Sequence, residues 1–138
     1  MVACLLVVVL LAQQVPPSFE TIARGGSSGV EQAQEQFVRT EAEWRALWKT
    51  HGASQAVPAV EFSTHAVAAV FLGTRPTSGF SVDTVGTHRE GDTLVIEYVE
   101  RRPNPGAIVS QVLTSSFHIV LVPRHDGPVR FQKKTIER

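Results

Sequence analysis

The sequence predicts a mainly β domain: an antiparallel sandwich or a barrel-like sheet with one N-terminal helix packed on it. A single segment with helical periodicity, residues 40–52, precedes about five apolar or alternating segments that are joined by short turns. Strands and helices do not alternate along the chain, so the pattern gives no indication of a parallel sheet. The predicted class is therefore α+β, with one helix and a dominant antiparallel β part.

The helix is the element that the sequence specifies best. Thr40 is a good N-cap, and Glu43 follows three residues later, which is the spacing of a capping box. Four residues recur at the i, i+3, i+4, i+7 spacing of one helical face: Trp44, Leu47, Trp48 and His51. Gly52 supplies a C-terminal stop. We expect the face that carries the two tryptophans to be buried against the sheet.

Two short strands are expected before the helix, the second returning beside the first. They are residues 19–24 and residues 34–39, with a turn of small residues at 25–29 between them. After the helix, residues 65–72 are almost all apolar, which is typical of a strand buried on both faces.

Four further strands complete the predicted sheet: residues 80–85, residues 93–100, a segment within 111–122, and residues 128–136. In the third of these, apolar residues at 117, 119 and 121 alternate with other residues. Because successive side chains of a strand point to opposite faces, His118 is expected to face outward.

Length and charge describe an ordinary globular domain. The chain has 138 residues, enough for one domain with its own core. Lys and Arg together number 13, as do Asp and Glu, so the formal net charge is zero. This balance does not favour a nucleic acid as a partner, and basic residues are not interleaved with aromatic ones.

The N-terminal residues 1–12 are uncharged and strongly apolar. This run is too short for a comfortable transmembrane helix and resembles the apolar region of a signal peptide; the alternative is an uncleaved anchor. We therefore expect one domain at 13–138, exported to the periplasm, cell envelope or exterior, with membrane contact only through the N-terminal segment if it is not cleaved. Cys4 is the only cysteine, so cleavage near Ala12 would leave no disulfide, Cys-bound metal or Cys nucleophile.

No catalytic or metal-binding pattern is present in the sequence. No two of the five histidines have the spacing of metal ligands along a strand or helix; they are His51, His65, His88, His118 and His125. Ser115, Ser116 and His118, with Asp83 or Asp92, supply the residue types of a serine hydrolase, but no Gly-x-Ser-x-Gly elbow holds them. We expect no enzyme activity, cofactor or metal; an enzyme whose site is not recognisable is the alternative.

Two loops are the least strand-like parts of the C-terminal region. Gly73–Gly79 and Arg101–Gly106 each contain an Arg-Pro pair and glycine. Proline and glycine allow a loop to be held in one unusual shape, which lowers the ordering cost of binding. The alternative is an ordinary turn, because proline and glycine are common turn residues.

We expect the two loops to meet at one end of the sheet and to bind a protein. The candidate binding residues are Arg75, Pro76, Thr77, Ser78, Gly79, Phe80, Pro103, Asn104, Pro105 and Gly106. Arg75 and Thr77 have no evident role in the core, and Arg75, Arg101 and Arg102 are expected at the rim of the contact surface.

Several motifs along the chain belong together. They are Trp48-x-x-His51, the run from Phe71 to Phe80 (FLGTRPTSGF), the Pro-x-Pro-Gly turn at Pro103–Gly106, and Gln-x-Leu-Thr at Gln111–Thr114. This pattern resembles the C-terminal domain of PrcB-like protease-complex subunits over about residues 40–131. Two positions depart from it: the family loop more often reads Thr-Gly-Gly-Tyr at 77–80, and a proline tends to stand at Ser116.

The resemblance implies an exported, non-catalytic domain, because the named member of the family is an accessory subunit of a surface protease complex. A looser likeness links residues 75–80 to the Asn-Pro-Thr-Thr-Gly-Tyr loop of chagasin-type cysteine-protease inhibitors. The expected function is an exported protein-binding or accessory module whose partner is a protein, with a secreted or surface protease as the specific candidate. The alternative is a protease inhibitor that presents loops 73–80 and 101–106.

Overall fold

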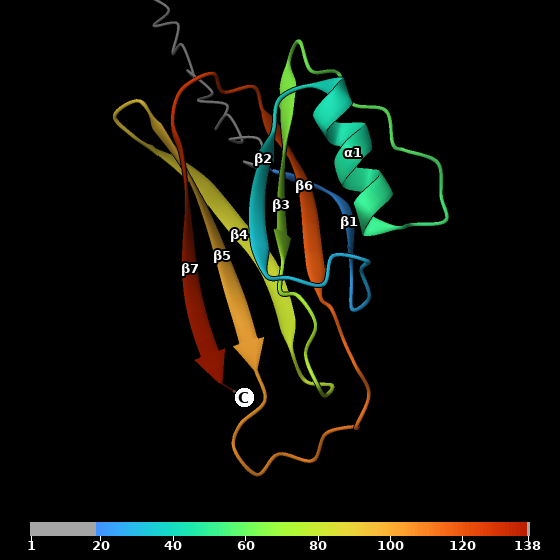
Figure 1. Ribbon diagram of the computed structural model, residues 1–138. Helices are drawn as coiled ribbons and strands as arrows, with labels where there is room; N and C mark the ends of the chain where they lie inside the picture. Colours follow the sequence, from blue (N-terminus) through green and yellow to red (C-terminus); the bar gives the residue numbers. More distant parts are fainter. Residues whose placement is uncertain (1–18, 138) are drawn as a thin grey trace, which may run out of the picture.

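The computed structural model describes residues 19–137. The predicted signal peptide or anchor at 1–12, the short linker after it and Cys4 lie outside the described residues. The elements follow one another as β1 (Glu20–Gly25), β2 (Gln34–Val38), α1 (Glu41–His51), β3 (His65–Phe71), β4 (Ser81–Glu90), β5 (Thr93–Arg102), β6 (Phe117–Pro123) and β7 (Val129–Glu137) (Figure 1).

The strands form two sheets that pack face to face. The four-stranded sheet has the order β1-β6-β3-β2 and is antiparallel throughout. The three-stranded sheet has the order β4-β5-β7. With α1 on the outer face of the larger sheet, the molecule has three layers (Figure 1). The predicted mainly β sandwich with one helix is confirmed.

One strand pair is parallel, which the sequence pattern does not indicate. β5 and β7 pair in parallel from Leu94↔Val129 to Arg102↔Glu137. Between them the chain passes through β6, which belongs to the other sheet. Two reversals of direction therefore separate β5 from β7, and they run the same way.

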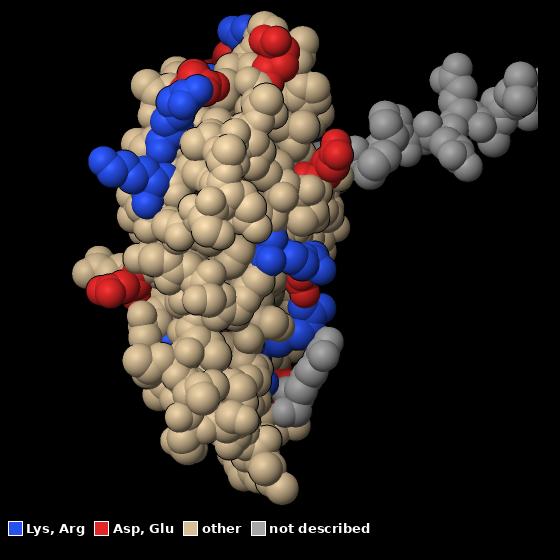
Figure 2. Space-filling view, turned by 90° about the vertical axis from the view of Figure 1, so that its right-hand side faces the viewer, with Lys and Arg blue, Asp and Glu red and all other residues tan. Residues whose placement is uncertain are grey.

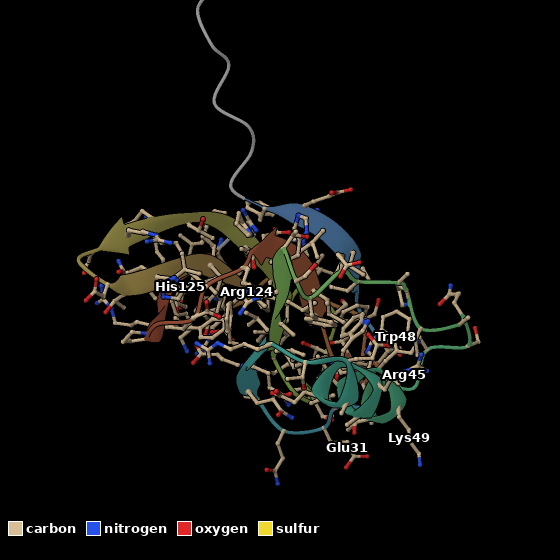
Figure 3. All side chains as sticks on the ribbon, turned by 90° about the horizontal axis from the view of Figure 1, so that it is seen from above. Glu31, Arg45, Trp48, Lys49, Arg124 and His125 are labelled. Atoms are coloured by element: carbon tan, nitrogen blue, oxygen red, sulfur yellow. The ribbon has the colours of Figure 1, made fainter. Side chains whose placement is uncertain are left out.

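The helix has the predicted limits and the predicted buried face. The Glu43 N–H donates to Thr40 Oγ1 (3.2 Å), and Gly52 ends the helix in the left-handed region at φ 77°. All four residues of the apolar face are buried: Trp44, Leu47, Trp48 and His51. Figure 3 shows Lys49 pointing away from the sheets, on the opposite side of α1 from the buried face.

The central strands β3 and β6 are buried on both faces. Val67, Phe71 and Ile119 contact the helix layer, whereas Ala68 and Val120 face the second sheet. The prediction for residues 65–72 is thereby confirmed.

The two strands before the helix exist, but they do not pair with each other. β1 pairs with β6 and β2 pairs with β3, so they form opposite edges of the larger sheet. The expectation that the second strand returns beside the first is wrong. The apolar strands β3 and β6 occupy the centre, where burial on both faces is complete, and the more polar β1 and β2 are left to the edges. Within residues 19–137, the helix lacks the length and hydrophobicity that a membrane span requires.

Candidate binding surface

The predicted loop Gly73–Gly79 lies at one end of the sandwich, where it approaches the second predicted loop at Pro103 and is bonded to the residues that follow that loop. The Arg75 N–H donates to the Thr114 carbonyl (2.7 Å) and the Thr114 N–H donates to the Arg75 carbonyl (3.0 Å). The Ser78 N–H donates to the Ser110 carbonyl (3.0 Å), and the Ser110 N–H donates to Ser78 Oγ (2.8 Å). The loop after β3 is therefore joined, residue by residue, to the segment that connects β5 to β6.

Glycine is required at both ends of the loop after β3. Gly73 has φ 74°, and an added Cβ would lie 2.6 Å from the backbone nitrogen of Ala33. Gly79 has φ 95°, and an added Cβ would lie 3.0 Å from Cβ of Pro103. At Gly73 the backbone therefore approaches its neighbour too closely for any side chain, whereas at Gly79 a side chain would crowd Pro103 and its φ would be strained. Gly79 is a point at which the two loops touch.

The remaining candidate residues divide into exposed and half-buried ones. Pro76, Asn104, Pro105 and Gly106 are exposed, whereas Thr77, Ser78, Phe80 and Pro103 are half-buried. The Asn104 carbonyl accepts from the Ala107 N–H (2.9 Å), which closes a turn around Gly106 at φ 82°. The exposed residues alone are available to a partner without rearrangement.

Arg75 is not free, and the expectation that it has no core role is wrong. Its guanidinium donates to Oε1 of Glu100 at 2.5 Å and lies 5.2 Å from the centroid of the Phe80 ring. The Glu100 side chain is 1% exposed. A carboxylate buried to this extent needs a cationic partner, and Arg75 supplies it. No local pattern indicates this pair, because the two residues are 25 positions apart on different elements.

The other two rim arginines are also paired. Arg102 donates from Nε to the second oxygen of Glu100 (2.9 Å), and Arg101 donates to Asp83, which also binds Arg24 (2.8 Å). Each cation that the sequence places at the rim therefore has a carboxylate partner. These residues fasten the base of the loops to the sheets, which leaves the loop tips to provide any contact with a partner.

The connection between β5 and β6 carries an apolar tip, which was not predicted as a site from the sequence. Among residues 19–137, three of the four exposed large hydrophobic residues lie on the β5–β6 connection: Ile108, Val112 and Leu113. Ile108 is fully exposed and Leu113 is 77% exposed. Residues 103–116 contain no charged side chain, and Figure 2 shows the lower end of the molecule without Lys, Arg, Asp or Glu colouring. The apolar residues of this segment can be seen in the sequence, but there they predict a strand. Only the fold shows that the segment is a loop.

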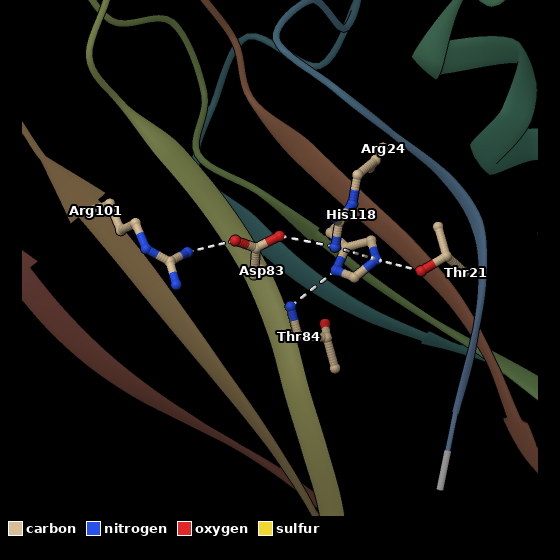
Figure 4. A network of polar contacts seen from close by, with 6 residues as sticks. All are labelled: Thr21, Arg24, Asp83, Thr84, Arg101 and His118. Carbon is tan, nitrogen blue, oxygen red and sulfur yellow. Dashed lines mark hydrogen bonds and ion pairs between the residues drawn. The ribbon is translucent and has the colours of Figure 1, made fainter. Parts of the chain in front are cut away.

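His118 lies between the two sheets, above the loop end. It is fully buried, so the expectation that it faces outward is wrong. Its Nδ1 accepts from the Thr84 N–H (2.8 Å), and Nε2 lies 2.9 Å from Thr21 Oγ1 (Figure 4). Because Nδ1 is an acceptor, the imidazole is neutral with its proton on Nε2. A polar residue on a sandwich strand faces the interior here because the second sheet covers that side of β6.

Burial and charge both favour the neutral imidazole. The pKa of His118 is lowered to about 4, chiefly by burial and also by the Arg24 guanidinium, while the Asp83 carboxylate opposes the shift. With a second bond to β1 through Thr21, the ring links β6 to both β4 and β1. His118 is therefore a structural crosslink and does not reach the loop tip.

A serine–histidine contact lies beside the helix in a hollow of about 380 Å³. Ser28 Oγ is 2.7 Å from Nδ1 of His51, and burial lowers the pKa of that imidazole. Three backbone amides around the serine are engaged: Ser28 N–H with Ser115 Oγ, Gly29 N–H with the His51 carbonyl, and Val30 N–H with Ser28 Oγ. These three amides are therefore unavailable to stabilise an oxyanion. The contact holds the 26–30 turn against the end of α1.

A second hollow, of about 310 Å³, opens between the sheets on the β2 side. Tyr98 donates to Oε2 of Glu35 (2.5 Å), and burial, with that carboxylate, raises the pKa of the phenol. Glu100 and Arg75 line the same hollow and are bound to each other. Four of its ionisable groups thus form two pairs, and Lys133 also lines the hollow. A third hollow lies at the opposite end, where Arg124 and His125 follow β6 (Figure 3).

Metal ligation has no support in the described part of the chain. Among residues 19–137, no three His, Cys, Asp or Glu side chains gather as a metal site would require.

Comparison with known proteins yields one match. Residues 66–123 match the model of the family described as PrcB C-terminal. The matched stretch runs from β3 through β6 and so contains both loops and the apolar tip. Neither a curated protein nor a solved structure matches the chain.

Proposed function

We propose that the chain is an exported, non-catalytic module that binds a protein partner, on the basis of the match of residues 66–123 to the family described as PrcB C-terminal. The observation that carries the proposal is the pair of loops at one end of the sandwich. Backbone bonds at Arg75–Thr114 and Ser78–Ser110 hold the two segments in one arrangement. A surface already fixed in shape loses little conformational freedom on binding, which is what a docking module needs.

The side chains around the loops favour binding over catalysis. The charged groups at their base, Arg75, Glu100 and Arg102, are engaged with one another, so none is presented as an acid, base or nucleophile. At the Ser28–His51 contact, the backbone amides of Ser28, Gly29 and Val30 are already engaged and cannot serve as oxyanion donors. Both observations support an accessory role.

A secreted or surface protease is the specific partner that we propose. Support comes from the match to the family described as PrcB C-terminal, because the resemblance to that family implies an accessory subunit of a surface protease complex. The test uses the mature chain, residues 13–138, with an affinity tag as bait in the secreted and envelope fractions of the source cells. We expect saturable binding of one protein, with a protease identified by mass spectrometry. Absence of any saturable protein partner would refute the proposal.

Protease inhibition is the second candidate, favoured by one observation. The two loops project together from one end of the sandwich, a geometry that suits insertion into an active-site cleft (Figure 1). Incubation with serine, cysteine and metalloproteases separates the two candidates. An accessory module leaves peptide hydrolysis unchanged or prolongs enzyme lifetime, whereas an inhibitor lowers hydrolysis in proportion to its concentration.

Export has its own test. We propose cleavage near Ala12, so the product isolated from the source cells should begin near Gln13. Intact-mass measurement of a soluble cytoplasmic product that retains Met1 would contradict export.

A further inference from the structure

We infer that the apolar tip, defined as Ile108, Val112 and Leu113, inserts into an apolar cleft of a folded protein partner. This rests on the proposed function and deepens it, because it names the contact residues and the chemistry of the surface that receives them. None of the three was among the loop residues expected from the sequence.

The first step is the exposure of the tip. Ile108 is fully exposed, Leu113 is 77% exposed and Val112 is 53% exposed. Single exposed apolar residues are ordinary on a protein surface, but three on one short connection form a patch. The free energy available from covering these side chains is not recovered within the described chain.

The second step is that the exposure does not come from a loose loop. The segment is held at Ser110, between Ile108 and Val112, by two bonds to Ser78, and at Thr114, directly after Leu113, by two bonds to Arg75. Thr114 Oγ1 also donates to the Thr77 carbonyl (2.9 Å). Val109 turns inward, within contact distance of where a Gly79 side chain would begin, while Ile108 turns outward. The chain thus half-buries one valine and presents the isoleucine beside it.

The third step concerns charge, and it argues against a lipid surface. Residues 103–116 carry no charge, and the cations of the adjoining segments, Arg75, Arg101 and Arg102, are bound to Glu100 or Asp83. Loops that dock on anionic membranes combine apolar residues with free Lys or Arg. The chain also enters the domain at the far end, since Glu20 pairs with Leu121 whereas the loop leads into Phe117. An anchor preceding β1 would hold the tip away from its own membrane.

The fourth step is shape. The tip lies on the connection that hangs below the two sheets in Figure 1, and the molecule narrows toward this end in Figure 2. Two convex ends in contact would bury few residues, whereas a stable interface takes roughly 20–30 residues a side. A second copy of the chain is therefore a poor fit. A cleft in the partner surrounds the projecting loop and contacts it on several faces.

The experiment places a photo-crosslinking amino acid at residue 108, at residue 113, or at residue 85 in the full chain. Val85, on β4, is the matched control because it is the fourth exposed large hydrophobic residue and is 52% exposed. The probes are the secreted and envelope protein fraction of the source cells, and vesicles of phosphatidylethanolamine and phosphatidylglycerol. We expect crosslinks from 108 and 113, but not from 85, to one protein, at apolar residues that line a concave surface of its structure.

Affinity for that purified partner then tests the energetics. Ile108→Ser with Leu113→Ser should weaken binding about 100-fold, since each side chain contributes about tenfold or more when covered. Val85→Ser should leave the affinity unchanged, and all variants should fold with wild-type stability. Because the contact is uncharged, the affinity should change less than about threefold between 50 and 500 mM NaCl.

Four outcomes overturn the inference. They are crosslinks from residue 85 in place of 108 and 113, crosslinks between two copies of the chain, flotation with the vesicles, and unchanged affinity in the double variant. If the wild-type chain binds a protein and the double variant binds it equally well, the inference fails while the proposed function stands. If the wild-type chain binds no protein, both fail.

Discussion

The helix side of the molecule and its loop end are held by different forces. On the helix side, Trp44, Leu47 and Trp48 are buried against apolar side chains of β3 and β6. The loop end is stabilised instead by backbone hydrogen bonds and by the buried Arg75–Glu100 ion pair. Apolar burial depends on area and tolerates small shifts, whereas hydrogen bonds and ion pairs depend on geometry. The difference suggests a support layer on one side and a shaped contact surface at the other end.

The largest effect is expected on the helix side. Trp48→Ala removes a side chain that is 6% exposed and leaves a cavity, so the free energy of unfolding should fall by about 3–5 kcal/mol. Denaturant unfolding followed by circular dichroism measures the loss. Lys49→Ala, on the exposed side of the same helix, is the matched control and should change stability by less than about 0.5 kcal/mol. Equal effects in the two variants would show that the helix is not fixed by apolar burial.

Low pH should destabilise the protein through His118, which lies between the two sheets. The pKa of His118 is lowered from 6.5 to about 4 in the folded chain, chiefly by burial, so the unfolded chain takes up the proton first as pH falls. The contribution of His118 is then complete above about pH 6.5 and is lost progressively toward pH 4, by about 3 kcal/mol. The nearby Arg24, Asp83 and Thr21 face the same ring.

The measurement is the free energy of unfolding between pH 7 and pH 4. His118→Asn should be less stable at pH 7 but should show a flatter pH dependence than the wild type over this range. Parallel curves for the two proteins would mean that His118 is not a buried neutral crosslink.

A smaller effect is expected from the ion pair at the loop end. Arg75→Ala leaves the buried carboxylate of Glu100 with Arg102 alone, so we expect a loss of about 2 kcal/mol. Arg45→Ala removes an ion pair with Glu41 in which both side chains are exposed, so the free energy of unfolding should fall by less than about 0.5 kcal/mol. Restoration of stability by Glu100→Gln in the Arg75→Ala background would confirm that the unpaired carboxylate is the cause. Similar small losses from Arg75→Ala and Arg45→Ala would make Arg75 an ordinary surface residue.

The smallest effect tests the close approach of the two loops. Gly79→Ala introduces a Cβ about 3.0 Å from Pro103 at φ 95°, and should cost about 1 kcal/mol. Gly26→Ala is the control, because an added Cβ there meets no atom within 4 Å. Thermal unfolding of the two variants compares them. A Gly79→Ala protein as stable as Gly26→Ala would show that the loops do not touch at this point.

Elements defined by local pattern were predictable from the sequence. The cap at Thr40, the apolar helix face and the apolar run of β3 follow from spacing alone, and all are found in the structure. The meeting of the two loops was also predicted, because a hairpin of β4 and β5 returns the chain to the same end.

Features that depend on contacts between distant segments were not predictable. His118 alternates with apolar residues as a solvent-facing side chain would, and only the second sheet reveals that both faces of β6 are covered. Arg75 and Glu100 are 25 residues apart, and no periodic pattern in the sequence indicates that they pair. Parallel pairing of β5 with β7 depends on which sheet receives β6, which the sequence pattern does not specify.

The most direct measurement is amide hydrogen exchange of the free domain, residue by residue. If backbone hydrogen bonds fix the two loops, the loop end is ordered before any partner binds. We therefore predict strong protection, about 100-fold or more, at the bonded amides of Arg75, Ser78, Ser110 and Thr114, together with fast exchange at the exposed tip residues Ile108 and Val112. Fast exchange at all six amides in the free domain would contradict a preformed contact surface.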